Sequence, residues 1–261
     1  MGIYEHRTKT SKPFIYFWEM MIKKKGRRER ARYILKPVNE YCKNAKKILE
    51  IGCGPGEVLV NLPKRYSIYG LDITKDYIEV CKKKIPRGKF FVSSMHNFKI
   101  DEKFDVIFSA NDAINFLKDF DQWKSTFKTV SEHLNSDGLF IFDVFTPKML
   151  RDTLRWREKI KKLTGSRATI FRKFSGGYED DTGIVKGNTL TWDEKILEKL
   201  PNRLYQLHEY KFIERIYPVA KMKSALTEHF DILESNFREK CRVILFVCRK
   251  KRDSKDIAEK P

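Results

Sequence analysis

Short apolar runs alternate with amphipathic segments from residue 47 to residue 144, a pattern typical of a parallel sheet with helices on both faces. The first run, Ile48, Leu49 and Ile51, is short and continuous, as expected of a strand buried on both sides. The predicted strands are 47–51, 67–71, 89–93, 103–109 and 138–144. Helices are predicted between them, at about 56–65, 74–85, 112–118 and 121–135.

The rhythm changes between residues 145 and 217. A helix is predicted at 147–162, and alternating Thr, Ile, Phe and Val then predict antiparallel hairpins. Their turns are expected at the glycines, namely Gly176-Gly177, Gly183 and Gly187. A helix near 218–229 and strands at 231–237 and 241–249 complete the pattern. The predicted fold is α/β: a doubly wound, mostly parallel, seven-stranded Rossmann-like sheet with an inserted antiparallel β subdomain or lid.

The chain before the first strand is different again. Residues 1–13 are polar and are expected to be loose, whereas the aromatic residues after Pro13 and the apolar positions up to Tyr41 predict one or two helices. These patterns divide the chain into a helical cap, a core in two segments, a β-rich insertion and a disordered tail. The predicted bounds are 1–46 for the cap, 47–147 and 218–250 for the core, 148–217 for the insertion and 251–261 for the tail.

The net charge of +19 is unevenly distributed along the chain. Residues 1–47 carry 14 Lys and Arg against 4 Asp and Glu, residues 48–147 carry 13 against 14, and residues 148–261 carry 27 against 17. Basic flanks around a neutral core suit an acidic substrate, RNA or a membrane surface, and they are equally well explained as a solvated, lysine-rich surface.

Cysteine usage and hydropathy limit the class of protein. The 5 cysteines have no C-x-x-C spacing and no disulfide-dense arrangement, so we expect no structural metal. There is no run of 18 apolar residues and no apolar signal core, which favours a soluble protein of the cytoplasm.

The stretch with the most chemical information is Ile-Leu-Glu-Ile-Gly-Cys-Gly-Pro-Gly at 48–56. A strand that runs directly into Gly52, Gly54 and Gly56 predicts a turn whose backbone can approach a nucleotide-like cofactor. Glu57 stands where a dinucleotide fingerprint would have a further glycine, which argues against NAD. Asp72, at the end of the second strand, is placed to accept hydrogen bonds from ribose hydroxyl groups.

These residues resemble a known family, the class I S-adenosylmethionine-dependent methyltransferases. The 48–56 stretch resembles their first motif, and Leu71-Asp72-Ile73 resembles the second. Phe104 to Ala110 resembles the fourth-strand motif, and Leu134 to Phe140 the turn into the fifth strand, with Ser136-Asp137 where the family commonly has Pro-Gly. Asn111 to Leu117 and Phe142 to Pro147 are similar to the branch that methylates small molecules and carries a β-rich insertion after strand five, which would cover the acceptor site.

The resemblance implies S-adenosylmethionine as cofactor and a set of residues that hold it. Glycines of the turn would approach the methionine end of the cofactor, and Asp72 would bind its ribose. Glu50 would hold the first loop or bind the cofactor's amino group. Ser94 stands where the family often has an acid that reads adenine, so that readout would pass to a backbone carbonyl or to the serine hydroxyl. The implied cofactor-binding residues are Glu50, Gly52, Cys53, Gly54, Gly56, Asp72, Ile73, Ser94, Met95, His96, Ala110, Asn111 and Asn115.

Methyl transfer from a sulfonium requires alignment more than a dedicated catalytic residue. If the acceptor needs a base, His96 is the candidate, although a histidine at a strand end is more often a loop or cofactor contact. His208, Glu209 and Tyr210 either face the substrate or are ordinary alternating strand positions.

Three functions remain open from the sequence. The first is a methyltransferase for a small-molecule acceptor, the second an RNA methyltransferase that uses the basic flanks, and the third a binding protein without catalysis. Asn111-Asp112-Ala113-Ile114 lacks the prolines of the N-P-P-[YF]-like motif that holds a flipped base, which argues against RNA. The acceptor and the oligomeric state are not encoded in any motif.

Overall fold

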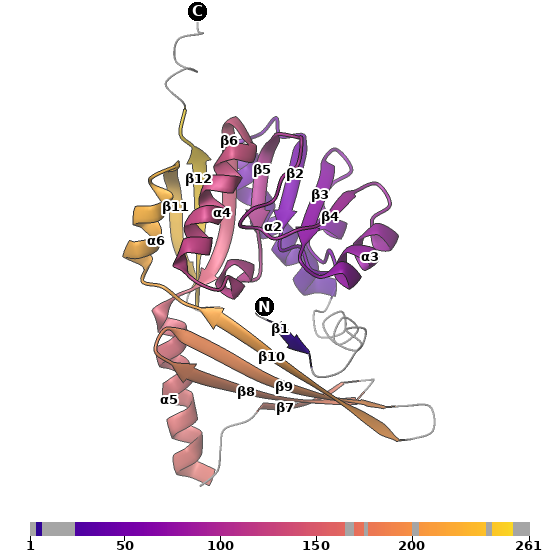
Figure 1. Ribbon diagram of the computed structural model, residues 1–261, viewed down its shortest axis with the longest axis vertical. Helices are drawn as coiled ribbons and strands as arrows, with labels where there is room; N and C mark the ends of the chain where they lie inside the picture. The colour runs from indigo at the N-terminus through magenta and orange to yellow at the C-terminus, as the bar shows by residue number, and fades with distance from the viewer. Residues whose placement is uncertain are drawn as a thin grey trace, which may run out of the picture.

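The protein folds into two β-sheets joined by helices (Figure 1). This computed structural model describes residues 4–6, 24–164, 170–174, 177–199, 204–238 and 242–252. A seven-stranded sheet forms the core, and a five-stranded antiparallel sheet lies across one end of it.

The core sheet has the strand order β11-β12-β6-β5-β2-β3-β4. Its strands are β2 (Lys47–Ile51), β3 (Ser67–Asp72), β4 (Lys89–Val92), β5 (Phe104–Ser109), β6 (Leu134–Phe145), β11 (Phe230–Arg238) and β12 (Val243–Lys250). Strands β2 to β6 pair in parallel, and β12 runs antiparallel to both of its neighbours. The chain moves outward from β2 in one direction through β3 and β4 and then returns to β5 on its other side, so the switch point of the topology lies at the carboxyl ends of β2 and β5.

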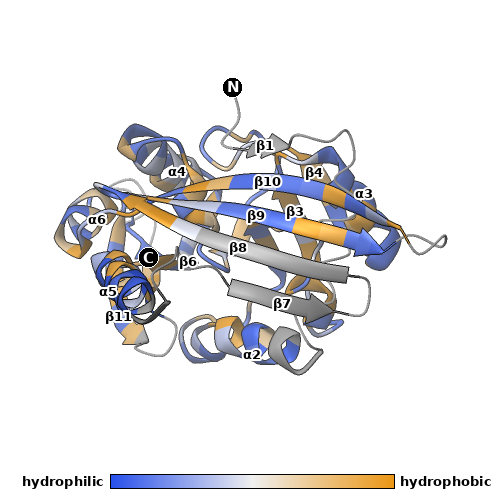
Figure 2. Cartoon of the chain, turned by 90° about the horizontal axis from the view of Figure 1, so that it is seen from below, coloured by the Kyte–Doolittle hydropathy of each residue, from blue (hydrophilic) through white to orange (hydrophobic). Residues whose placement is uncertain are grey.

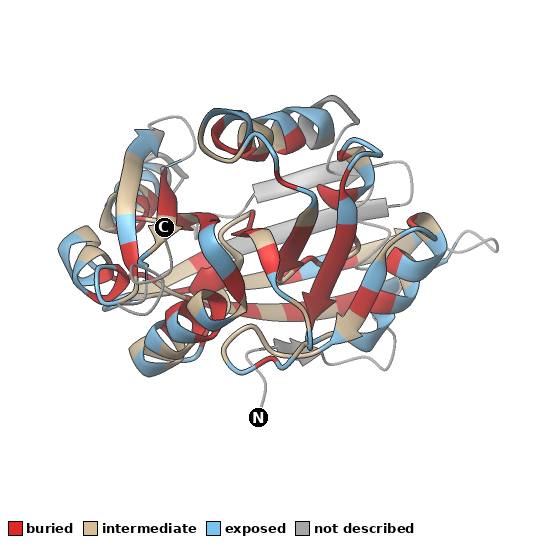
Figure 3. Cartoon of the chain, turned by 90° about the horizontal axis from the view of Figure 1, so that it is seen from above, coloured by how far each residue is buried: buried red, intermediate tan, exposed pale blue. Residues whose placement is uncertain are grey.

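Helices bury both faces of this sheet, and the buried central strands lie between them in Figure 3. The helices are α2 (Lys24–Tyr41), α3 (Lys75–Lys84), α4 (Phe120–His133) and α6 (Val219–Leu226), with short 3-10 turns η1 (Leu59–Asn61) and η2 (Ala113–Phe116). On one face, α4 and α6 pack through Trp123, Phe127 and Met222. On the other, α2 contributes Ala31, Ile34 and Val38, which are spaced to share one side of a helix.

The antiparallel sheet has the order β1-β10-β9-β8-β7 and crosses in front of the core strands in Figure 2, which views the molecule from below. Its strands are β1 (Tyr4–His6), β7 (Ile170–Phe174), β8 (Gly177–Lys186), β9 (Thr189–Lys199) and β10 (Tyr205–Arg215), and α5 (Pro147–Thr164) leads to it from β6. Ile196, Tyr210 and Phe212 of this sheet pack with Tyr77 of α3 and Phe116 of η2. Since these two partners belong to segments that follow β3 and β5, the sheet covers the carboxyl ends of the parallel strands.

The fold class and most elements are confirmed, with five local differences. The helix predicted at 56–65 is wrong: only the 3-10 turn η1 forms, because the run is interrupted by Pro63 and contains the β-branched Val58 and Val60. The segment predicted as a helix at 112–118 is likewise a 3-10 turn, η2. Strand β6 begins at Leu134, four residues before the predicted start, since Leu134 already pairs with Phe104.

The fourth and fifth differences concern the first described residues and one predicted turn of the insertion. Residues Tyr4–His6, expected to be loose, pair with β10. Gly183 is not a turn residue: it lies inside β8 opposite Trp192, where a Cβ would come within 2.9 Å of the indole ring. Gly187, with φ +61°, does form the β8–β9 turn. The predictions for residues 14–23, Gly176 and 253–261 lie outside the described residues.

Candidate active site

The loop that follows β2 is built on three glycines with positive φ, at +69° for Gly52, +50° for Gly54 and +77° for Gly56. Added Cβ atoms at Gly52 and Gly56 would press on neighbours, 2.8 Å from Met95 Cε and 3.0 Å from Cys81 Sγ respectively. At Gly54 an added Cβ would meet no described residue within 4 Å. Gly54 therefore presents bare backbone to open space at the switch point of the sheet.

Asp72 organises this loop from the end of β3. Its Oδ2 accepts a hydrogen bond from the Gly54 backbone N–H at 2.9 Å, and its Oδ1 accepts one from Thr74 N–H at 2.9 Å. Burial raises the pKa of this carboxyl group, and the two backbone bonds oppose that rise. The adjacent Ile73 is 52% exposed, so an apolar side chain lies open beside the carboxylate.

Glu50 lies inside the sheet just before the glycine loop and is 2% exposed. Its Oε2 has no hydrogen-bond partner in the part of the chain that the structure describes. Burial, and then the charges of Cys81, Asp72, Asp143 and Glu57, raise its pKa well above the ordinary value. An unsatisfied buried acceptor calls for a donor, and the ammonium group of a methionine-type cofactor beside the open Gly54 backbone fits that requirement.

The segment after β4 packs against the same loop. Met95 lies directly against Gly52, since its Cε is the nearest atom to a Cβ added at that glycine, at 2.8 Å. Ser94 Oγ and His96 Nδ1 share a hydrogen bond of 2.6 Å, and the His96 carbonyl oxygen accepts bonds from Ser125 and Thr129 of α4. Ser94, Met95 and His96 are half-buried, and α4 fixes the backbone at His96 beside the glycine loop.

The end of β5 joins the two sheets. Ser109 Oγ donates to the Ile51 carbonyl at 3.0 Å, which ties the ends of β5 and β2 together. Asn115 is fully buried: its amide nitrogen donates to the Arg215 carbonyl of β10 at 2.8 Å, and its oxygen accepts from Phe145 N–H of β6 at 2.9 Å. Asn115, expected near the sulfonium with Ala110 and Asn111, therefore holds the antiparallel sheet to the core.

The sequence did not single out four acidic residues at this junction, which we name the acidic cluster: Asp112, Asp143, Glu194 and Glu214. Asp112 N–H donates to Asp143 Oδ1 at 3.0 Å. The pKa of Asp112 is raised to about 8 by burial and by the charge of Asp143, against the lowering effect of Arg30. Burial raises the pKa of Glu214 well above its ordinary value, and the charges of Asp112 and Glu194 raise it further.

A strand-parity argument would have found the two glutamates. Glu194 lies two residues after Trp192 on β9, and Glu214 two residues after Phe212 on β10, so each glutamate shares a face with its aromatic neighbour. This face packs on the core, where apolar residues are expected. By the same parity His208 and Tyr210 point inward, and Glu209 points outward to Lys195 at 3.8 Å. His208 is buried and bonds Glu198 at 3.0 Å, so strand alternation accounts for it.

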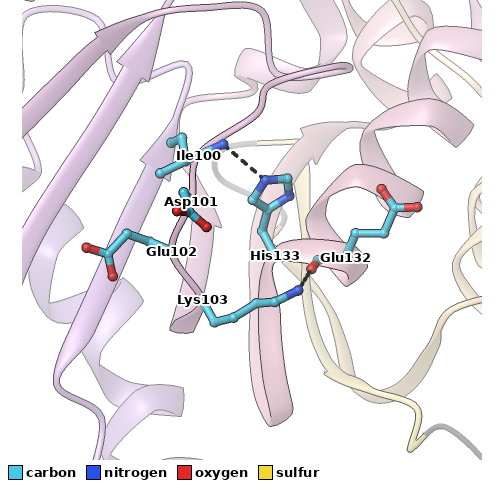
Figure 4. A pocket seen from close by; sticks show the side chains of 6 residues that line it. All are labelled: Ile100, Asp101, Glu102, Lys103, Glu132 and His133. Atoms are coloured by element: carbon cyan, nitrogen blue, oxygen red, sulfur yellow. Dashed lines mark hydrogen bonds between the residues drawn. The ribbon is translucent and has the colours of Figure 1, made fainter.

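A surface hollow lies elsewhere, at the opposite ends of the strands (Figure 4). It is lined by Ile100, Asp101, Glu102, Lys103, Glu132 and His133. His133 Nε2 accepts a bond from Ile100 N–H, and Lys103 reaches the Glu132 carbonyl. Since these residues precede β5 and end α4, the hollow is separate from the glycine loop.

The described part of the chain contains neither a metal centre nor a membrane-spanning helix. No group of three or more His, Cys, Asp or Glu in the described ranges is placed to hold a metal ion. Within the same ranges, no helix has the length and apolar character needed to cross a membrane.

Comparison with known sequences identifies the glycine-loop region. A family model described as a methyltransferase domain matches residues 48–138. A protein of Geobacillus sp. (strain WCH70), named as a candidate methyltransferase, is 27% identical over 141 residues, which cover 52% of this chain and 57% of that protein. The dTDP-3-amino-3,4,6-trideoxy-alpha-D-glucopyranose N,N-dimethyltransferase of Streptomyces venezuelae is 23% identical over 38% of this chain and 42% of its own length. The chain thus spans about half the length of these curated relatives.

Solved structures match over nearly the full chain. An S-adenosylmethionine-dependent methyltransferase from Clostridium acetobutylicum ATCC 824 has a TM-score of 0.75 at 17% identity and covers 92% of this chain and 98% of its own. The sugar N-methyltransferase KedS8 from Streptoalloteichus sp ATCC 53650 has a TM-score of 0.76 at 17% identity over 91% of this chain and 93% of its own. The fold is therefore that of these enzymes, antiparallel sheet included. The family model thus places a methyltransferase domain at residues 48–138, and the solved structures show that the chain has the fold of S-adenosylmethionine-dependent methyltransferases.

Proposed function

We propose that the protein transfers a methyl group from S-adenosylmethionine to a small-molecule acceptor held between the glycine loop and the antiparallel sheet. The observation that carries this proposal is the open backbone at Gly54, next to the unsatisfied buried Oε2 of Glu50. When bound, the cofactor supplies a methyl group on a sulfonium, ready for in-line displacement.

The chain's own residues hold and orient the reactants. Gly54 and Glu50 are assigned to the methionine end, Asp72 to the ribose, and Met95 to the side of the adenosine. Asp72 keeps lone pairs for the ribose even while it accepts the two backbone bonds. Alignment of this kind can contribute about 7–11 kcal/mol to the rate of a two-reactant step.

His96 stays a candidate base rather than an assigned one. Its Nδ1 is engaged by Ser94, which leaves Nε2 free to exchange a proton in that ring orientation. A cofactor contact would use the same position. The relatives named above include an aminosugar N,N-dimethyltransferase and a sugar N-methyltransferase, which supports a small acceptor rather than RNA.

Calorimetric titration with S-adenosylmethionine and S-adenosylhomocysteine tests the proposal. The wild-type protein should bind both, and Gly54→Ala should weaken binding at least tenfold, because its Cβ enters the space assigned to the cofactor. The αL strain of a non-glycine residue costs about 1–2 kcal/mol, so the variant should still fold.

Gly187→Ala is the matched control, since Gly187 also has positive φ and open space around its Cβ but lies in a distant hairpin turn. It should lose similar stability and keep cofactor affinity. A wild-type protein that binds neither compound would refute the proposed function.

A further inference from the structure

We infer that the inward face of the antiparallel sheet is a binding site for a basic amine, with Glu214 and Asp112 as the groups that receive the acceptor nitrogen. This inference rests on the proposed function and specifies its substrate class. It differs from one of the alternatives that the basic flanks left open, an acidic acceptor.

The first support is a buried oxygen that lacks a partner. Glu214 is 3% exposed; its Oε1 accepts a bond from Trp192 Nε1 at 3.1 Å, whereas Oε2 has no partner among the described residues. A buried carboxyl oxygen left unsatisfied costs about 1–3 kcal/mol. A donor that arrives with the ligand would recover this free energy, and an ammonium group is such a donor.

The second support is the gathering of acidic groups around that oxygen. Glu214 interacts electrostatically with Asp112 and Glu194, and Asp112 with Asp143. Arg30 of α2 is the cation that acts on Asp112, and its Nη1, like that of Arg215, is a buried nitrogen without a hydrogen-bond partner among the described residues. Arg215 follows Glu214 in the chain and joins the core through its backbone carbonyl. A bound cation would stabilise the ionised form of these groups, whose proximity raises their pKa values, whereas an acidic acceptor would disfavour that form further.

The third support is the aromatic wall beside the carboxylates. Trp192, Tyr210 and Phe212 of the sheet pack with Tyr77 of α3 and Phe116 of η2. Tyr210 and Phe212 are stacked, with ring centroids 6.3 Å apart. Aromatic faces attract ammonium and methylammonium groups, so the wall suits both the acceptor and its methylated product.

The acidic cluster lies between the glycine loop and the antiparallel sheet, where the acceptor nitrogen would have to meet the methyl group. Asp143 acts on Glu50 as well as on Asp112, so the carboxylates extend from the cofactor loop to the antiparallel sheet. The pKa of Asp112, about 8, is close to that of many amines, which favours proton exchange between them.

Methyl transfer to an ammonium acceptor begins with the loss of a proton. A carboxylate takes one proton from R–NH₃⁺, which frees the nitrogen lone pair. The lone pair forms the N–C bond to the methyl group while the C–S bond breaks with its electron pair on sulfur. The positive charge passes from sulfur to the methylated nitrogen, beside the remaining carboxylates.

Matched pairs of probes test the inference by binding, independent of turnover. The protein is saturated with S-adenosylhomocysteine and titrated with phenethylamine and 2-phenylethanol, and with a dTDP-linked 3-amino-3,6-dideoxyglucose and its 3-hydroxy counterpart. At least one amine should bind about 10- to 100-fold more tightly than its alcohol, the range expected for a hydrogen bond to a charged group.

Variants then assign the preference to residues. Glu214→Gln should abolish the preference for the amine, whereas Glu209→Gln, on the outward face of the same strand, should retain it. If Glu214→Gln does not fold, Asp112→Asn provides the second test, because asparagine tolerates the left-handed backbone at that position (φ 52°).

Two results would overturn the inference: alcohols that bind as tightly as their amines in the wild type, or an amine preference that persists in both variants. Either result with normal S-adenosylhomocysteine binding leaves the proposed function intact. Loss of S-adenosylhomocysteine binding in the wild type would instead reject the proposed function.

Discussion

At the scale of single residues, Asp72 has two roles that use the same two carboxylate oxygens. It fixes the glycine loop through Gly54 and Thr74, and it is the residue assigned to the ribose. The loop contacts lie within the described structure, whereas the ribose contact is a proposal. A substitution at Asp72 therefore affects loop geometry and ligand contact together.

Asp72→Ala should weaken cofactor binding by about 1.5–3 kcal/mol, the usual value for hydrogen bonds to a charged group. Titration calorimetry with S-adenosylhomocysteine measures the change. Glu79→Ala, an exposed position on the neighbouring helix α3, serves as the control and should bind like the wild type. Unchanged affinity in Asp72→Ala would argue against the ribose role.

Asp112 should make stability depend on pH. Its pKa in the folded protein is about 8, above the ordinary value near 3.9 that we expect in the unfolded chain. Between these values the unfolded chain has released a proton that the folded protein retains, so stability falls as pH rises and levels off above pH 8.

Asp112→Asn removes that dependence. The Tm of the wild type should fall relative to the variant between pH 5 and pH 8, by about 2–4 °C for each kcal/mol in a protein of this size. Thermal melts at matched ionic strength measure this. Melting curves that shift in parallel with pH would contradict the prediction.

At the scale of elements, Asn115 is the link between β5, β6 and β10. Its amide satisfies a carbonyl on β10 and an N–H on β6, and the two partners are 70 residues apart in the sequence, at positions 145 and 215. A fully buried asparagine in a 3-10 turn thus determines where the antiparallel sheet sits.

Asn115→Ala should leave both backbone groups unpaired and cost about 2–5 kcal/mol of unfolding free energy. Urea unfolding measures the loss, and hydrogen exchange should accelerate at Phe145 N–H in particular. Asn135→Ala, which removes an exposed bond to Asp105, is the control and should cost under about 1 kcal/mol. Equal losses in the two variants would show that Asn115 does not act as the link.

The elements also show how far sequence reasoning extends. The strands β2, β3 and β5 were predicted closely because each is a local apolar run that ends in glycine or a polar turn. The structural role of Asn115 was not predicted, and Glu214 was not singled out. Both depend on contacts between strands that lie far apart in the sequence. Asp72 and Glu50 lie at the glycine loop as expected, and their contacts with the cofactor stay predictions.

At the scale of the whole molecule, positive charge and the acidic cluster occupy different places. The excess of Lys and Arg lies in the flanking segments, including α2 and α5. At the junction of the two sheets, by contrast, Glu194 and Glu214 are buried and Asp112 and Asp143 are half-buried. The net charge of +19 therefore describes the outer surface and not the site.

Salt titration distinguishes a surface charge from an RNA site. A protein that neutralises 6–10 phosphates loses about 10³–10⁵ in affinity between 50 and 200 mM salt. We expect this protein to bind bulk RNA only at low salt, with no retention at physiological ionic strength, as filter binding would show. RNA that stays bound at 150 mM salt and becomes methylated would instead favour the RNA methyltransferase hypothesis.

The left-handed backbone at Asn111 and Asp112, with φ of 60° and 52°, has a consequence for how the protein can diverge. Such conformations admit asparagine, aspartate and glycine readily and exclude branched or bulky residues. Position 112 therefore tolerates aspartate, asparagine or glycine. A lineage could change the charge offered to the acceptor there by a single-nucleotide substitution without disturbing the fold, so acceptor preference is free to evolve at a point where the backbone permits little else.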